Sequence, residues 1–319
     1  MGSLQFTWID GHTLPGKRVV AIGNFDGVHR GHQAVLAHVR DEAKTRGVPS
    51  TILTFDPHPA SVLGRVAPPR LTTLERKAEL VRAIGIELVL VKRFDLDLSE
   101  QSPERFATEL LAGTLGAELV VVGDNFRFGH KRVGDLGTLR SLGKTLGFEV
   151  EVFEVIADAG GPLSSTRVRE ALSLGSVAEA RAMLGRPHRI EGVVERGAQR
   201  GRQLGFPTAN VGNIAEMLPT HGVYAVRVIA GAETYDGVMN VGVRPTVDGV
   251  RATQEVHLFD VDLDLYGHRL GVDLIARIRE ERKFNGLDEL KAQIQKDASQ
   301  ARALLATAAA TSAAFPSKR

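Results

Sequence analysis

The sequence predicts an α/β domain built on a Rossmann-like parallel sheet, followed by an antiparallel β-barrel with a C-terminal helix. Up to about residue 185, short apolar runs alternate with amphipathic stretches, as in right-handed βαβ units. Beyond that point strand-like runs dominate, and glycine and proline mark the joins between them. We therefore expect one domain over residues 1–185 and a second over 186–306. The alanine-rich end, 307–319, is expected to be disordered.

The first half contains five apolar runs with the length and composition of buried strands. Two helices are expected between them, one over 72–84, which Thr72 and Glu75 open as a capping box, and one over 103–115, which Ser102 caps. Because ligands bind beyond the carboxyl ends of parallel strands, the polar segments after three of these runs should converge on one crevice. The expected strands are 18–23, 50–55, 87–91, 118–123 and 148–156, and the converging segments are 24–32, 56–59 and 124–127.

The second half has the pattern of a closed antiparallel sheet. Its last strand-like run alternates apolar and polar residues, as expected of a half-buried strand, and one helix over about 287–305 comes after it. The expected strands are 189–195, 223–229, 234–241, 252–259 and 269–278.

Composition excludes several classes of protein. Of the 319 residues, 43% are hydrophobic and 24% charged, which is typical of a soluble globular protein. No apolar run approaches the roughly 18 residues needed to cross a bilayer, and the N-terminus lacks the pattern of a signal peptide. The chain has no cysteine, so a cytoplasmic location is the default expectation. A net charge of +2 is too small to indicate nucleic acid, so we expect neither nucleic-acid nor membrane partners.

The segment 23–32, Gly-Asn-Phe-Asp-Gly-Val-His-Arg-Gly-His, is the most informative part of the chain. It comes after an apolar run and precedes a helical pattern, so it places His29 and His32 at a helix N-terminus, where free backbone N–H groups favour anions. Two imidazoles beside a phosphate site predict nucleotidyl transfer. The alternatives are half of a zinc site, for which the chain offers no cysteine, or two polar turn residues. The strand–turn–helix context favours the nucleotide.

A second basic element lies at 164–169, where a loop again opens a helix. The hydroxyl groups of Ser164 and Thr166 and the guanidinium of Arg167 can bind the β- and γ-phosphates of ATP. The alternative is an ordinary helix cap with a surface arginine.

The second half has its own candidate site. A glycine-rich basic loop, which includes Gly201, Arg202 and Gly205, suits a phosphate, since glycine lets the backbone approach a ligand closely. Thr208 and Asn210 offer hard oxygen ligands for Mg²⁺, and Glu255 can accept a proton from an attacking hydroxyl. Taken singly, these residues also fit a hairpin loop, a cap and an outward-facing strand glutamate.

Along nearly its whole length the chain resembles the prokaryotic bifunctional riboflavin kinases/FMN adenylyltransferases, also called FAD synthetases. The matching segments occur in the same order as in that family. In the first half they are GNFDGVHRGHQ (23–33), TFDPHP (54–59), LTTLERKAEL (71–80), VVVGDNFRFG (120–129) and SSTRVREAL (164–172). In the second half they are RGRQLGFPTAN (200–210), GVYAVRV (222–228), NVGVRPT (240–246), EVHLFD (255–260), LYG (265–267) and EERKF (280–284).

The resemblance implies a nucleotidyltransferase fold followed by a riboflavin kinase barrel. It implies that riboflavin and ATP give FMN, and that FMN and ATP then give FAD and pyrophosphate, both steps with Mg²⁺. His29 and His32 would assist adenylyl transfer, and Glu255 would be the base on the ribityl hydroxyl. The implied ATP-binding residues are Gly23, Asn24, Phe25, Asp26, Gly31, Asn125, Ser164, Thr166, Arg167, Gly201, Arg202, Gly205 and Thr208. The implied flavin-binding residues are Phe55, Asp56, Arg244, Pro245 and Thr246, and the implied Mg²⁺ ligands are Thr208 and Asn210.

One departure from the family pattern is visible, Val247 in place of a frequent aromatic residue, which bears on flavin affinity. Two alternative functions remain open: only one of the two reactions is catalysed, or the chain is a flavin-sensing module that binds FMN without turnover. The presence of Glu255 and of both histidines favours the bifunctional enzyme. A monomer or weak homo-oligomer is expected.

Overall fold

The computed structural model describes residues 6–10, 12–196, 206–246, 249–261 and 263–313, with the backbone alone for 243–246, 249–252 and 309–313. The chain forms two compact units that meet in the sequence between Ser164 and Ser165. This division groups the two short helices before the barrel with the barrel itself. The domain boundary near residue 185 stays a prediction.

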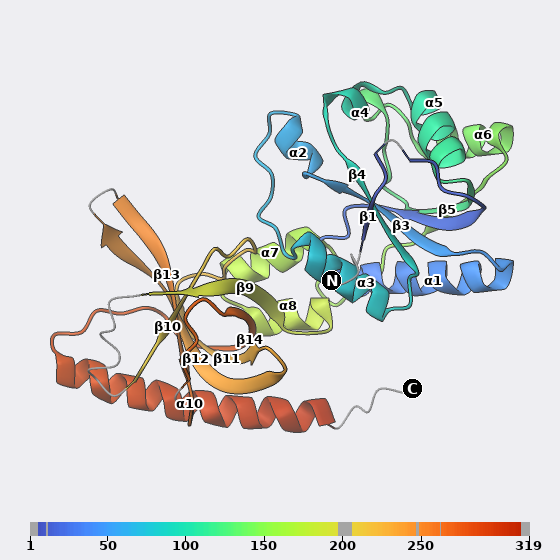
Figure 1. Ribbon diagram of the computed structural model, residues 1–319. Coiled ribbons are helices and arrows are strands. Elements are labelled where there is room, and N and C mark those ends of the chain that lie inside the picture. Colours follow the sequence, from blue (N-terminus) through green and yellow to red (C-terminus); the bar gives the residue numbers. More distant parts are fainter. Residues whose placement is uncertain (1–5, 11, 197–205, 247–248, 262, 314–319) are drawn as a thin grey trace. The chain divides into compact units, whose positions relative to one another are not determined.

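The first unit is a parallel sheet with helices on both faces (Figure 1). Its six strands lie in the order β1-β4-β3-β2-β5-β6, and every pairing is parallel. The strands are β1 (Thr7–Trp8), β2 (Arg18–Ile22), β3 (Ser50–Asp56), β4 (Leu88–Arg93), β5 (Ala117–Gly123) and β6 (Glu149–Phe153). The helices are α1 (Arg30–Arg46), α2 (Pro59–Val62), α3 (Leu74–Ala83), α4 (Leu96–Glu100), α5 (Pro103–Arg105), the π-helix η1 (Phe106–Thr114), the 3₁₀-helix η2 (His130–Arg132) and α6 (Leu136–Leu146). A small ribbon, β7 (Ala157–Asp158) with β8 (Gly161–Pro162), comes next.

Strand β2 lies between the two cores of this unit. Val19 and Ala21 point to the core that α1 and α3 cover, whereas Val20 and Ile22 point to the core that η1 and α6 cover. A strand buried on both faces needs apolar residues throughout, which explains the continuous apolar run that predicted it. The turns after β2 and β3 therefore begin at the end of a sheet that is packed against helices on both faces.

The expected helix starts were mostly right. Ser102 caps α5, because its hydroxyl accepts a hydrogen bond from Arg105 N at 3.2 Å. The cap of α3 was wrong by one residue: Thr73, not Thr72, accepts from Arg76 N at 3.1 Å. The reason is that the Thr72 hydroxyl accepts from Gly27 N at 3.2 Å and so serves the turn after β2.

The helix expected over 103–115 changes its winding after its first turn. After α5 it continues as η1, and its C-cap Leu115 N donates to Leu110 O at 2.9 Å, the i→i−5 bond of a π-helix. The strand β1 was missed because two residues are too few to show an alternating pattern.

The second unit contains a closed six-stranded barrel, in the order β10-β13-β12-β11-β14-β9, with antiparallel pairing throughout. Among the described residues, two helices precede the barrel and one comes after it. The elements are α7 (Ser165–Ser173), α8 (Val177–Leu184), β9 (His188–Glu195), β10 (Ala209–Gly212), β11 (Gly222–Ala230), β12 (Glu233–Thr246), β13 (Gly249–Leu258), β14 (Arg269–Arg279) and α10 (Leu287–Ala313).

The long helix α10 packs against the outer face of the barrel (Figure 1). Its buried Ala301 and Leu305 contact a cluster that includes Ala225 and Ile275. The helix ends at Ala313. Residues 307–313 are therefore helical, which corrects the expectation that they are disordered. Alanine has the highest helix propensity, so the alanine-rich segment extends the helix. In the part of the chain described, no helix is long and apolar enough to span a membrane.

Candidate active sites

The turn between β2 and α1 has an unusual backbone that the fold holds in place. Phe25 and Val28 have positive φ angles of 47° and 41°, which are costly for residues other than glycine. The Asp26 carboxylate accepts hydrogen bonds from the backbone N–H groups of Leu71 and Thr72, each at 3.1 Å. These bonds tie the turn to the segment before α3. A nucleotide contact of Asp26 stays a prediction, as does one of Phe25, whose side chain is 5% exposed in the core.

His29 and His32 come together at the start of α1, as the sequence predicts. Their rings stack with centroids 3.7 Å apart, and His29 Nδ1 accepts a hydrogen bond from His32 N at 3.3 Å as the N-cap. A ring nitrogen that accepts is unprotonated, so the proton of a neutral His29 lies on Nε2. Gly31 permits this stack, because a Cβ at that position would lie 3.1 Å from His29 Cε1 and Nδ1.

Burial keeps His32 neutral. Desolvation lowers the pKa of His32 well below its usual value, and the charges of His29 and Lys77 lower it further. Its Nδ1 atom is buried and has no hydrogen-bond partner among the described residues. The pair therefore presents a neutral imidazole with an unsatisfied polar atom beside a helix N-terminus.

A cavity of about 260 Å³ lies at the carboxyl edge of β2 and β3. One part of its lining is apolar or aromatic, and the other part is polar. The apolar and aromatic residues are Phe55, Pro57, Ala67, Pro68 and Leu74, and the polar ones are Asn24, Asp26, Asp56, His58, Ser61, Arg70, Thr72 and Lys77.

Two of the three segments expected to converge thus line one cavity, those after β2 and β3. The third segment contributes no residue to the lining, although Asn125 lies just after β5, the strand beside β2. His29 and His32 are not in the lining either. Ser164 ends the first unit, and Thr166 and Arg167 lie in the first turn of α7 in the second. Their approach to the histidines stays a prediction.

Asn24, a predicted ATP-binding residue, lies in this cavity beside His58, which sequence reasoning did not name as a site residue. His58 Nδ1 accepts from Ala60 N at 3.1 Å, so a neutral His58 carries its proton on Nε2. The amide nitrogen Nδ2 of Asn24 lies 3.3 Å from His58 Nε2.

Lys77 was also missed. Its side chain is 8% exposed and lines the cavity, and its Nζ donates to Thr54 Oγ1 at 3.1 Å. Burial lowers the pKa of Lys77 to about 8. The signal was present in the sequence, because Leu74, Ala78 and Val81 mark a buried helix face on which a lysine at position 77 is out of place.

In the barrel, the strand register brings together three candidate residues. Glu255 of β13 pairs with Asn210 of β10 on one side and with Asn240 of β12 on the other. Directly opposite residues on neighbouring strands have side chains on the same face, so a carboxylate lies between two amides. Asn240 was quoted in the sequence only as part of a matching segment.

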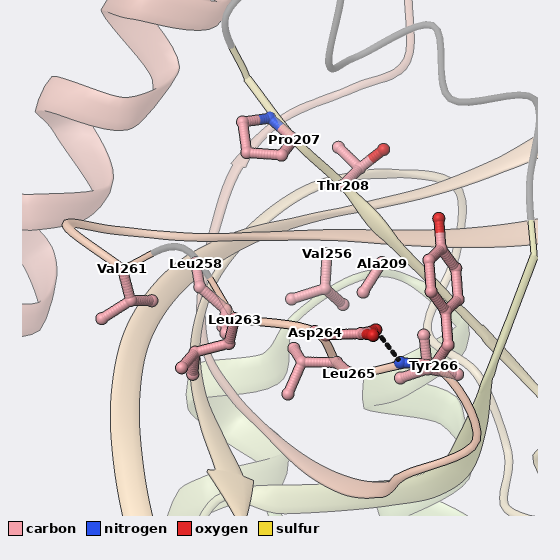
Figure 2. Close-up of a pocket in the computed structure, with 11 residues that line it drawn as sticks. Pro207, Thr208, Ala209, Val256, Leu258, Val261, Leu263, Asp264, Leu265 and Tyr266 are labelled. Carbon is pink, nitrogen blue, oxygen red and sulfur yellow. Dashed lines mark hydrogen bonds between the residues drawn. The ribbon is translucent and has the colours of Figure 1, made fainter.

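A second cavity, of about 290 Å³, lies beside this register (Figure 2). Thr208 and the ring of Tyr266 border it on one side of the view, and Val261 and Leu263 on the other. Tyr266 N donates to Asp264 Oδ1 at 3.2 Å. Glu255 is not among the lining residues, because Val256 and Leu258, which alternate with it, face the cavity.

Several predicted residues of the barrel cannot be placed in the same way. Gly201, Arg202 and Gly205 lie outside the described residues. Arg244, Pro245 and Thr246 form the end of β12, where the backbone pairs with β13. Their roles stay predictions.

The donor chemistry of the barrel site fits a hard cation better than a transition metal. In the described residues no group of three or more histidine, aspartate or glutamate side chains is placed to hold a metal ion. Thr208 and Asn210 offer neutral hydroxyl and amide oxygens, which suit a Mg²⁺ ion that keeps waters and shares substrate phosphates.

Comparisons with known proteins agree with this division into two sites. The family model described as FAD synthetase matches residues 12–167, and the one described as riboflavin kinase matches residues 184–305. The bifunctional riboflavin kinase/FMN adenylyltransferase of Escherichia coli K12 is 43% identical over 286 residues, which are 89% of this chain and 91% of that protein. The Bacillus subtilis protein of the same name is 39% identical over 293 residues, 89% of this chain and 92% of that protein.

One solved structure shares the fold along both units. It is titled a macrolide-efflux protein from Streptococcus pneumoniae, has a TM-score of 0.83 and 29% identity, and covers 91% of this chain and 95% of its own. That title describes the other protein and names neither reaction. The identity to the curated relatives over both units decides the family: the chain belongs to the bifunctional riboflavin kinases/FMN adenylyltransferases.

Proposed function

We propose that the barrel of this chain makes FMN from riboflavin and that its α/β unit makes FAD from FMN, each with ATP. The chain is a bifunctional riboflavin kinase and FMN adenylyltransferase. Glu255 serves the first of these steps, and the stacked histidines serve the second.

In the adenylyl step, an oxygen of the FMN phosphate attacks the α-phosphorus of ATP. A new P–O bond forms, the bond to the β-phosphate oxygen breaks, and pyrophosphate leaves. His29 Nε2–H and the neutral imidazole of His32 donate hydrogen bonds to the oxygens on which charge accumulates, next to the N-terminus of α1. The support is the stacked pair itself and the unsatisfied buried nitrogen of His32.

In the kinase step, the terminal ribityl hydroxyl of riboflavin attacks the γ-phosphorus of ATP, and ADP leaves. Glu255 accepts the hydroxyl proton, and Asn210 and Asn240 orient its carboxylate from the two neighbouring strands. Thr208 and Asn210 would hold Mg²⁺ with the phosphates of ATP. When bound, the ion neutralises phosphate charge.

The observation that carries the proposal is the presence of one complete polar constellation in each unit: the stacked histidines in one, and the Asn210–Glu255–Asn240 register in the other. A cytoplasmic location, a monomer or weak homo-oligomer, and the absence of nucleic-acid partners remain parts of the proposal.

The test is a time course of the full chain with riboflavin, ATP and Mg²⁺, in which flavins are separated by chromatography. FMN that appears first and FAD that appears later support both steps. FMN without FAD contradicts the proposed role of the histidines. Tight flavin binding without any product supports a flavin sensor instead.

A further inference from the structure

Lys77 is a buried cation that the proposed mechanism does not use. It lies on the inward face of α3, is 8% exposed and lines the cavity of the α/β unit. Burial of an ammonium group is costly unless a partner compensates its charge. The position of this lysine therefore needs an explanation from its surroundings.

The groups around Lys77 leave most of its hydrogen-bonding capacity unused. Its Nζ donates to Thr54 Oγ1 at 3.1 Å, and the Thr54 hydroxyl donates to Asn24 O at 3.2 Å. An ammonium group has three N–H donors, so two remain after Thr54. Among the described residues, no ion pair or further hydrogen bond takes them up.

The two carboxylates near Lys77 form hydrogen bonds or ion pairs with other residues. Asp26 accepts hydrogen bonds from Leu71 N and Thr72 N, and Asp56 pairs with Arg70 at 3.1 Å. Asp26 and Asp56 favour the charged form of Lys77 electrostatically, but the hydrogen bond that Nζ forms among the described residues goes to Thr54.

The other residues that line the cavity indicate which ligand Lys77 would bind. The aromatic and apolar residues, among them Phe55, Pro68 and Leu74, suit a flat ring system such as a flavin. The proposed function places the polyphosphate of ATP at the N-terminus of α1, whose two histidines do not line this cavity.

We propose that Lys77 binds the 5′-phosphate of the FMN acceptor, and that this contact lets the α/β unit select a phosphorylated flavin over riboflavin. The inference rests on the proposed function and adds a specificity-determining residue to it. A neutral riboflavin in the same cavity would leave the ammonium donors unsatisfied, which makes the discrimination strong.

The first experiment compares FAD formation from FMN and ATP by the full chain and by Lys77→Met and Lys77→Arg. Lys77→Met should raise the KM for FMN by roughly 10- to 100-fold, since one charge-assisted hydrogen bond is lost, and leave the KM for ATP nearly unchanged. Lys77→Arg should restore most of the FMN affinity. Lys144→Met, an exposed lysine on α6, should behave as the unaltered chain.

A KM for ATP and a kcat of FAD formation close to those of the unaltered chain report that the α/β unit of each variant is folded. If the KM for FMN is unchanged in Lys77→Met, or if the KM for ATP rises as much, the inference is wrong. If the unaltered chain makes no FAD from FMN, the proposed function itself fails, so the two failures are distinguishable.

A second experiment measures how FAD formation depends on pH in the unaltered chain and in Lys77→Arg. Because the pKa of Lys77 is about 8, the kcat/KM for FMN should fall above about pH 8 as the ammonium loses its proton. The charged and titratable groups that face Lys77 are Asp26, Asp56, Arg70, His32 and His58. The alkaline fall should be absent in Lys77→Arg, whose guanidinium stays charged. A fall of the same size in Lys77→Arg would overturn the assignment.

Discussion

The two sites of this chain are assembled in different ways. In the α/β unit, Asn24 and His29 lie in the turn between β2 and α1, and Gly31 and His32 lie in the first turn of α1. The proximity of these four residues therefore results from sequence spacing. In the barrel, Asn210 and Glu255 come from strands far apart in the sequence, and only the register of the closed sheet brings them together. A site built on one turn is therefore visible in a sequence, whereas a site built on register needs the structure.

The variant with the largest expected effect on activity tests the strand register of the barrel. Glu255→Ala should lower FMN formation by about 10²- to 10⁴-fold, since it removes the general base, and should leave conversion of FMN to FAD intact. Glu195→Gln is the matched control, because Glu195 also pairs with Asn210 but on the other side. It should retain FMN formation. Equal losses in both variants, or a loss of FAD formation in Glu255→Ala, would contradict separate sites.

The next largest effect tests the turn of the α/β unit. The double change His29→Ala and His32→Ala should slow FAD formation by roughly 10²- to 10³-fold, since two donors to the reacting phosphate are removed. FMN should then accumulate from riboflavin. FAD that forms at an undiminished rate would refute the role given to the stacked pair.

A smaller effect tests the packing inside that turn. Gly31→Ala places a methyl group 3.1 Å from His29 Cε1 and Nδ1, so the ring must shift. We expect about tenfold slower FAD formation, since a small misplacement of a catalytic group is costly. The control is Gly137→Ala on α6, where the nearest atom to the new Cβ, Asp135 Oδ1, lies 3.4 Å away. If both variants slow FAD formation equally, the close contact at Gly31 is not the cause.

The smallest effect concerns stability. The pKa of His32 is lowered in the folded state. Below about pH 6.5, His32 therefore binds a proton in the unfolded chain and stays unprotonated in the folded chain. The free energy of unfolding of the first unit should therefore decrease as the pH is lowered through that range. In His32→Gln this decrease should be smaller. The fluorescence of Trp8, the one tryptophan of the chain, reports on this unit. His12→Gln, at an exposed position, should behave as the unaltered chain.

Sequence patterns predicted most of the fold, and the exceptions have physical causes. The buried strands of the α/β unit and the long barrel strands carry continuous or alternating apolar patterns. β1, with two residues, and β10, with four, are too short for either. The end of α10 was placed too early because alanine carries no amphipathic signal, although it favours a helix.

The sites show the same contrast. His29 and His32 were found from spacing, and the structure places them in contact. Lys77 and Asn240 were not found as site residues, because the first depends on which helix face the sheet buries and the second on strand register. Both are properties of tertiary structure.

The central claim is that each unit completes its own reaction and that FMN is the product of one and the substrate of the other. Mixing two variants, each of which lacks one of the two activities, tests it most directly. Glu255→Ala alone should give no FMN from riboflavin, and the double histidine variant alone should stop at FMN. Together, with riboflavin, ATP and Mg²⁺, they should make FAD after a lag in which FMN accumulates. If the mixture makes no FAD while each variant keeps its remaining activity, the two sites do not work independently and the account is wrong.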